Sequence, residues 1–336
     1  MKVLLDKISN REDLSADEAE RAFCAMVQGE LDAAQIAALL IGLRTKGEHT
    51  TEVIGAARAL RNSCAPFERP HYDTADSCGT GGDGAHTINV STATAVVAAE
   101  MGVRMVKHGN RSVSSQCGSA DVLEALGVRI DAANDTSRRC LDEAGICFLY
   151  APQNHPGLRF AGPVRQALGV RTVMNLLGPL VNPARPSVQI MGVYDPALLE
   201  PVAKVLGALG CRSAMVVHGS GLDEVAVHGP TQAVWYRDGA LQRLTFSPTD
   251  AGLKRFCLTE IRGGGARENA VVLRRIFEGQ GTDAQNAVVA MNAGALAMVA
   301  GLAADIREGT DLAMDALTGG GCAARLEHFA RLSHAV

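Results

Sequence analysis

The sequence lacks the apolar segments that direct a chain into or across a membrane. Its first residues, MKVLLDKISNREDLS, hold only a short apolar run before charges return, whereas a secretory signal peptide needs an apolar core of about 7 to 15 residues. The most apolar stretch, residues 293–304, is shorter than the roughly 18 residues that a spanning helix requires. These absences predict a cytoplasmic protein.

A basic block and paired cysteines are also missing. The chain has 32 Lys and Arg against 36 Asp and Glu, a formal net charge of -4, with the two signs interspersed. Because nucleic-acid binding needs clustered basic residues, this pattern argues against a nucleic-acid partner and leaves a small anionic ligand open. Nine cysteines without C-x-x-C spacing favour reduced core thiols over disulfides or a zinc site.

Glycine is abundant, at 36 of 336 residues in an otherwise ordinary soluble composition, which indicates many close backbone approaches. The first part of the chain reads as helix throughout. Ser15, Asp32 and Thr51 are placed to cap three successive amphipathic segments within residues 1–66. Because three short helices cannot bury their apolar faces alone, they need a larger domain, a second subunit, or both.

From about residue 72, strand-like and helical segments alternate. Short apolar runs such as VRMVKHG, CFLYAP, VQIMGVYD and SAMVVHG are separated by helical ones, the pattern of a mainly parallel sheet flanked by helices. After Glu224, turn signals at Gly229-Pro230 and Asp238-Gly239 predict an antiparallel excursion. The fold class predicted is α/β, with a small all-helical part preceding the sheet.

One glycine-rich stretch, DSCGTGGDGAHTINVST at residues 76–92, lies between a strand candidate ending near Cys78 and a helical segment. Ligands of open α/β sheets bind where such loops enter helix N-termini. Glycine allows positive φ and close approach of a phosphate, so the loop is predicted to form an anion-binding concavity, with a flexible turn as the alternative. Asn89, Ser91 and Thr92 can cap the helix, bind phosphate or ligate a hard cation.

A second loop, KHGNRSVSSQCGSAD at residues 107–121, also follows a strand candidate and precedes a helix. Lys107, His108 and Arg111 stand there among small hydroxyl residues, as suits a loop folded over phosphate oxygens. Alone, it also fits a solvated basic turn. Two such loops after successive strands predict one ligand that carries several phosphates.

Carboxylates and an arginine supply the remaining chemistry. Asp223 and Glu224 are adjacent in GSGLDEVAVHG; they suit Mg²⁺, which takes one or two carboxylates and completes its shell with phosphates and water, or else form a surface turn. Arg165 is a candidate for bidentate recognition of a substrate carboxylate. His155 either faces the same substrate or is a structural histidine before a proline.

Four motifs carry a resemblance to a known family. In order, GTGGDGAHTINVST, KHGNRSVSSQCGSADVLEALG, NLLGPLVNPA and GLDEVAVHGPT resemble, over nearly the whole chain, the anthranilate phosphoribosyltransferases of tryptophan biosynthesis. The resemblance implies magnesium-dependent transfer of the 5-phosphoribosyl group from phosphoribosyl pyrophosphate to the amine of anthranilate. It also implies a homodimer through a helical domain, here residues 1–66 joined by helical segments around 160–180, with residues 72–336 as the α/β domain.

The motifs and the resemblance together predict residues for each ligand. For phosphoribosyl pyrophosphate these are Gly79, Gly82, Asp83, Thr87, Asn89, Val90, Ser91, Thr92, Lys107, His108, Gly109, Asn110, Arg111, Ser112, Val113, Ser114, Ser115 and Ser119. For anthranilate they are Gly79, Asn110, His155 and Arg165, and for magnesium Ser91, Asp223 and Glu224. The catalytic set is Asp223, Glu224, Lys107, Arg165 and His108.

The chemistry of the implied reaction assigns roles to some of these residues. The metal, the loop amides and Lys107 would stabilise the charge that develops on pyrophosphate, and Arg165 would orient the acceptor. His108, water or a pyrophosphate oxygen is the proton acceptor. Asp83 is unexplained, because a carboxylate repels phosphates unless it faces the ribose hydroxyls, a metal-bound water or the amine.

Two details depart from the family pattern, and two other functions remain as alternatives. HPGLR replaces the more usual H-P-A-M-R, and Met174 replaces a usual Phe, so only fine acceptor preference is in doubt. A pyrimidine nucleoside phosphorylase would use phosphate as nucleophile, and the GLDE pair argues against it. A non-catalytic, nucleic-acid-binding relative would lack these carboxylates and carry a basic surface.

Overall fold

Four helices begin the chain in the computed structural model, which describes residues 1–112 and 116–335. They are α1 (Lys2–Ser9), α2 (Ala16–Gln28), α3 (Ala33–Lys46) and α4 (Thr50–Asn62). Ser15 and Asp32 cap α2 and α3 as predicted. Helix α4 instead begins with His49 as its N-cap, because the Thr51 hydroxyl donates to the Leu14 carbonyl at 2.7 Å.

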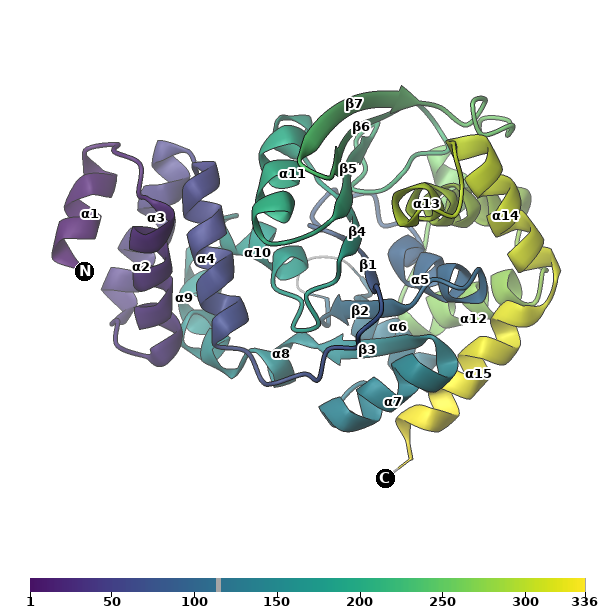
Figure 1. Cartoon of the computed structure of the whole chain (residues 1–336), viewed down its shortest axis with the longest axis horizontal. Helices are drawn as coiled ribbons and strands as arrows, with labels where there is room; N and C mark the ends of the chain where they lie inside the picture. The colour runs from purple at the N-terminus through teal and green to yellow at the C-terminus, as the bar shows by residue number, and fades with distance from the viewer. Residues whose placement is uncertain (113–115, 336) are drawn as a thin grey trace.

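Later segments of the chain complete this helical layer (Figure 1). These are α8 (Ala151–Asn154), η1 (Pro156–Phe160), α9 (Gly162–Leu168) and α10 (Met174–Leu180). Helix α9 packs on α3, η1 on α2, and α10 on α4. The buried side chains of this layer continue without a break into α11 (Leu199–Ala208) and one face of β4 and β5. The N-terminal helices therefore bury their apolar faces against the larger part of the chain.

A buried arginine fastens α4 to that larger part. The Arg61 Nε donates to the Leu180 carbonyl at 2.7 Å, and its Nη1 donates to the Leu209 carbonyl at 2.8 Å. These carbonyls stand at the C-terminal ends of α10 and α11, where backbone acceptors lack helical partners and positive charge is favoured. One guanidinium thus joins three helices.

The sheet has seven strands in the order β3-β2-β1-β4-β5-β6-β7. They are β1 (Ala75–Gly79), β2 (Met105–Gly109), β3 (Ile146–Tyr150), β4 (Val188–Gly192), β5 (Ser213–Gly219), β6 (Thr231–Arg237) and β7 (Ala240–Phe246). The first five strands run parallel, while β6 and β7 are antiparallel. The predicted α/β class, with a mainly parallel sheet and an antiparallel excursion, is confirmed.

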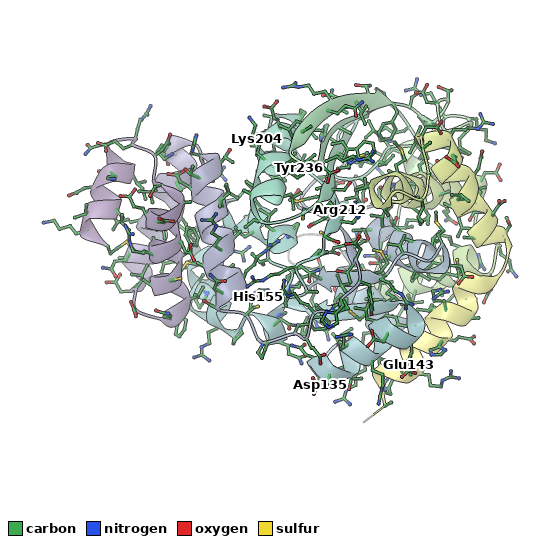
Figure 2. All side chains as sticks on the ribbon, in the orientation of Figure 1. Asp135, Glu143, His155, Lys204, Arg212 and Tyr236 are labelled. Atoms are coloured by element: carbon green, nitrogen blue, oxygen red, sulfur yellow. The ribbon has the colours of Figure 1, made fainter. Side chains whose placement is uncertain are left out.

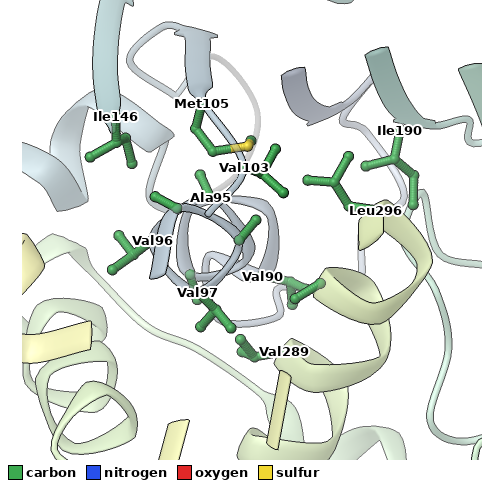
Figure 3. Packing of buried hydrophobic residues seen from close by; sticks show 14 of the residues in the cluster. Val90, Ala95, Val96, Val97, Val103, Met105, Ile146, Ile190, Val289 and Leu296 are labelled. Carbon is green, nitrogen blue, oxygen red and sulfur yellow. The ribbon is translucent and has the colours of Figure 1, made fainter. Parts of the chain in front are cut away.

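Helices cover the faces of the sheet. They are α5 (Val90–Glu100), α6 (Ser119–Ala125), α7 (Asn134–Ala144), α11, α12 (Ala266–Phe277), α13 (Asp283–Ala300), α14 (Ile306–Thr318) and α15 (Gly321–Ser333), with short turns η2 (Pro196–Leu198) and η3 (Leu258–Ile261). Figure 3 shows Val97 of α5 and Val289 of α13 in one cluster with Met105 and Ile190 of the strands. This packing holds the start of α5 at the edge of the sheet where the glycine loop ends.

Two expectations about the whole chain can be compared with this fold. Within the described ranges, no helix combines the length and the apolar character needed to cross a membrane. Cys140, Cys147, Cys211 and Cys322 are buried free thiols, in line with cysteines that serve as small core residues.

Candidate functional site

The sheet reverses its strand order between β1 and β4, and the predicted site gathers at their carboxyl ends. Ala75 pairs with Val188 and Gly79 pairs with Gly192, although more than a hundred residues separate the strands. Crevices of this kind bind ligands in open α/β sheets. A Cβ atom on Gly79 would lie 2.8 Å from the Asp223 Cγ and closer still to its Oδ2. Position 79 requires glycine, because the Asp223 carboxyl group occupies the space that a side chain would fill.

The Asp223 carboxyl group is tied to the first glycine loop. It is buried, with 8% of the residue exposed, and its Oδ2 accepts a hydrogen bond of 2.6 Å from the Gly81 backbone amide. Burial and the neighbouring charge of Asp83 raise the pKa of Asp223 to about 7. Asp83 also accepts from the Ala85 amide at 3.0 Å. Asp83 therefore faces a second carboxyl group across the site.

Lys107 and Ser91 form the floor beside this carboxyl pair. Lys107 is 2% exposed, and its Nζ donates to the Ser77 carbonyl at 2.7 Å and the Ser91 Oγ at 3.2 Å. Burial and the charge of Asp223 raise the pKa of Glu224 well above its usual range, while Lys107 and the Ser91 backbone amide lower it. The structure thus brings together side chains from β2, the start of α5 and the loop after β5.

This donor set fits a magnesium ion bound jointly with a substrate. Without a ligand, burial raises the pKa of both Asp223 and Glu224, and a bound cation would favour their ionised forms. Within residues 1–112 and 116–335, no group of three His, Cys, Asp or Glu side chains is arranged to hold a metal ion unaided. Mg²⁺ typically takes one or two carboxylates and fills its other positions with phosphate oxygens and water, so Asp223, Glu224 and the Ser91 hydroxyl suit it.

Several residues at the start of α5 that the sequence assigned to phosphate binding are hydrogen-bonded or buried within the protein. The Val90 amide donates to the Ile88 carbonyl at 2.7 Å, and the Thr92 amide donates to the Asn89 carbonyl at 3.1 Å. The side chains of Val90 and Thr92 are buried, and Thr87 pairs with Arg262 in an isolated β-bridge. Direct contact of these residues with phosphate stays a prediction.

The exposed arginine of the second loop pairs with carboxylates of α6. Arg111 Nη1 lies 2.9 Å from both the Asp121 and the Glu124 carboxylates, and Ser119 Oγ donates to the Asn110 carbonyl at 3.4 Å. Because exposed ion pairs contribute little free energy, this guanidinium can be redirected to a phosphate. The Gly109 Cα faces the same Ser119 hydroxyl, which leaves no room for a side chain. The Ser112 backbone amide also donates to Asp121, at 3.0 Å, whereas the predicted positions Val113, Ser114 and Ser115 lie outside the described residues.

Two buried histidines, His108 and His155, meet edge to face with their ring centroids 5.2 Å apart. Figure 2 labels His155, which lies beside the helical layer. His108 Nδ1 lies 3.0 Å from the Gly178 carbonyl; since a carbonyl only accepts, Nδ1 donates and Nε2 keeps its lone pair. Among the described residues, that Nε2 is buried and has no hydrogen-bond partner. Burial and His155 lower the pKa of His108 to about 3, and burial lowers that of His155 to about 4. Both rings are neutral at pH 7.

Arg165, on α9, is half-buried and stands apart from the phosphate loops. Burial lowers the pKa of its guanidinium, and no residue in the described ranges forms an ion pair with it. A guanidinium that lacks an internal carboxylate partner suits an anionic ligand. Its approach to the acceptor stays a prediction.

Sequence reasoning missed two residues next to the site. Asp76, fully buried on β1, accepts from Asn182 Nδ2 at 2.9 Å; an acid inside a strand candidate was the available signal. Arg171 donates to the Gly82 carbonyl and stacks on the Tyr194 ring, with its Cζ 4.3 Å from the ring centroid. An exposed loop arginine carries no local pattern that points to this contact.

Comparisons with known proteins agree with this geometry. Residues 2–64 match the helical bundle domain and residues 71–323 the a/b domain of the glycosyl transferase family. An anthranilate phosphoribosyltransferase from Sorangium cellulosum is 54% identical over 333 residues, 99% of this chain and 96% of that protein. The crystal structure of anthranilate phosphoribosyltransferase from Thermus thermophilus has a TM-score of 0.94 at 39% identity and covers 99% of both chains. The Saccharomyces cerevisiae enzyme in complex with PRPP and Mg has a TM-score of 0.91 at 26% identity, covering 100% of this chain and 98% of its own.

Proposed function

The chain belongs to the anthranilate phosphoribosyltransferases of the glycosyl transferase family, and on that basis we propose how its own residues carry out the reaction. The reaction is transfer of the 5-phosphoribosyl group from phosphoribosyl pyrophosphate to the amine of anthranilate. It gives N-(5-phosphoribosyl)anthranilate and pyrophosphate in tryptophan biosynthesis, and its cofactor is Mg²⁺. The family, the activity and the cofactor predicted from the sequence are confirmed.

The hydrogen bond between Asp223 Oδ2 and the Gly81 amide carries the assignment of roles. It joins the acidic motif after β5 to the glycine loop after β1, while Lys107 joins the second loop to Ser91. Three motifs far apart in the sequence therefore converge on one crevice. This convergence supports a site in which one ligand with several phosphates is held together with a metal.

At the donor side, Asp223, Glu224 and the Ser91 hydroxyl would hold Mg²⁺, which neutralises charge on the departing pyrophosphate when it is bound. Lys107 contributes a fixed positive charge from the buried floor, where the low polarity strengthens its effect. Its bonds to Ser77 and Ser91 hold the ammonium in place before the substrate arrives. The negative charge that develops on pyrophosphate therefore meets an ammonium group that is already in place.

At the acceptor side, Arg165 binds the anthranilate carboxylate and fixes the direction of the amine, with Gly79, Asn110 and His155 as further contacts. The amine is neutral at pH 7, so it attacks without prior deprotonation. The proton that the amine loses then passes to water or a pyrophosphate oxygen. His108 Nε2 suits this role less well than the sequence predicted, because it is buried and a pKa of about 3 makes it a weak base.

Loss of anthranilate fluorescence tests the assignment directly. We expect the purified protein to consume anthranilate when phosphoribosyl pyrophosphate and Mg²⁺ are present, and to stop when a chelator is added. Asp223→Asn should remove most of this activity, because the amide replaces a metal-binding oxygen. Full activity in the chelated sample, or a requirement for inorganic phosphate, would contradict the proposed roles.

The helical layer is the proposed site of dimer formation. We assign residues 1–66, with the segments around 160–180, to the helical domain and residues 72–336 to the α/β domain. Val3 is 69% exposed and lines a groove of about 520 Å³ that has an apolar part (Met1, Leu4, Ala22, Ala25 and Leu31) and a polar part (Glu18, Arg21, Glu30 and Gln35). A second copy of the chain would bury the apolar part of this groove, and we place the dimer in the cytoplasm.

Light scattering tests the dimer. We expect the mass of two chains for the native protein, and of one chain for Val3→Glu, because the new carboxylate would be buried in the contact. Arg11→Glu, on the exposed turn after α1, provides a charge control. A native protein with the mass of one chain would overturn the proposed dimer.

A further inference from the structure

A pair of asparagines links three loops around the donor site. Asn269, on α12, is 1% exposed; its Oδ1 accepts from the Gly264 amide at 2.7 Å, and its Nδ2 donates to Asn89 Oδ1 at 2.8 Å. The Asn89 Nδ2 then donates to the Cys117 carbonyl at 3.1 Å. One chain of hydrogen bonds thus runs from a third glycine loop, residues 261–265, through the first phosphate loop to the second.

The direction of this chain of bonds is fixed by its ends. The Gly264 backbone N–H only donates and the Cys117 carbonyl only accepts, so each amide can be oriented in one way. Asn269 must present its oxygen to Gly264 and its nitrogen to Asn89. Because Asn269 is buried and the three bonds are part-buried, removing one member leaves polar atoms with reduced access to water and without partners, which is costly.

The backbone of the third glycine loop is also hydrogen-bonded to that of the first phosphate loop. The Ile88 amide donates to the Ile261 carbonyl at 3.0 Å, and the Gly263 amide donates to the His86 carbonyl at 2.8 Å. A Cβ on Gly263 would lie 2.7 Å from the Thr87 carbonyl oxygen and 2.7 Å from Asn269 Oδ1. Only glycine allows this approach, and Ser91 lies three residues after Ile88.

We propose that Asn269 is a positioning residue for phosphoribosyl pyrophosphate: through Asn89 it sets the spacing between the two phosphate loops. The inference rests on the proposed function and extends it to residues outside both loops. The third loop and Asn269 hold Asn89, and with it the start of α5, before the ligand binds. Loss of this support weakens binding of the donor substrate and leaves the acceptor side unchanged.

Asn269→Asp is the sharpest variant. Its carboxylate still accepts from Gly264, while its second oxygen replaces the donor and repels Asn89 Oδ1. We expect the Kd of phosphoribosyl pyrophosphate with Mg²⁺, measured by calorimetry, and its KM to rise at least about tenfold, with the anthranilate KM within about twofold of wild type. Asn286→Asp is the matched control, because that half-buried amide donates only to the Gly281 carbonyl and should leave both values unchanged.

Two further variants keep the test decisive if Asn269→Asp folds poorly. Gly263→Ala should raise the same Kd, because its methyl group pushes the third loop from Thr87. In a cycle of Asn89→Ala and Asn269→Ala, the double variant should bind no more weakly than Asn89→Ala alone. The proposal would be overturned if the increases in Kd from Asn89→Ala and Asn269→Ala multiplied in the double variant. It would also be overturned if the KM values of both substrates rose equally. Absence of donor binding by the wild-type protein would instead contradict the proposed function itself.

Discussion

Gly79→Ala gives the most direct test of how the donor site is built. A Cβ at this position would lie 2.8 Å from the Asp223 Cγ, whereas carbon atoms in contact prefer roughly 3.5 Å or more. The Asp223 carboxyl group must therefore retreat by at least about 0.7 Å, which lengthens and weakens its 2.6 Å bond to the Gly81 amide. A misplacement of about 1 Å costs on the order of a hundredfold in rate, so we expect kcat/KM to fall by about tenfold to about a hundredfold.

Steady-state loss of anthranilate fluorescence at saturating Mg²⁺ measures this effect, and the thermal midpoint shows whether the variant folds. Gly162→Ala is the matched control, since a Cβ there meets nothing within 4 Å and the backbone is helical. The reasoning fails if folded Gly79→Ala retains kcat/KM within about threefold of wild type. It also fails if Gly162→Ala loses as much activity.

Three further predictions concern the charges of the site. Lys107→Met should lower kcat by about a hundredfold or more in the fluorescence assay, because a fixed charge near the leaving group is lost; an unchanged kcat would remove Lys107 from that role. Arg165→Ala should raise the anthranilate KM by about tenfold or more and spare that of phosphoribosyl pyrophosphate, whereas equal rises would contradict acceptor binding. The raised pKa of Asp223, about 7, means that the folded protein without ligand holds a proton that the unfolded chain releases. Its contribution to the free energy of unfolding is therefore lost as pH rises from about 4 to about 7, while the lowered pKa values of His108 and His155 act in the opposite direction. In urea unfolding, the stability of Asp223→Asn relative to wild type should therefore rise over this pH range, and a difference that stays constant would exclude Asp223 as a contributor.

Local patterns sufficed for much of the fold. Ser15 and Asp32 cap helices through side chains within three residues along the chain, so the sequence contains everything that determines those ends. Helix α1 has no side-chain cap, and α4 begins at His49 because Thr51 bonds to the distant Leu14. These two features depend on tertiary contacts, and periodicity does not report them.

The same division holds at the site. Motif spacing predicted Lys107, Ser91 and Asp223 as site residues, and the fold places them close together. Motif spacing did not explain why position 79 must be glycine. The Asp223 carboxyl group, which occupies the space of a side chain at position 79, comes from a loop 144 residues later. Asn269 went unnoticed for the same reason: an asparagine in a helical segment looks solvated until its partners, Gly264 and Asn89, are known.

The shared burial of the helical layer and the sheet has a consequence for how the two parts behave. The first four helices have no separate hydrophobic core, since their buried side chains continue into α11, β4 and β5 and Arg61 binds carbonyls on both sides. A unit of this kind melts as a whole, because opening one part exposes apolar area in the other. Truncating the N-terminal helices would therefore loosen α9, which packs on α3 and carries Arg165, so the acceptor side would lose rigidity.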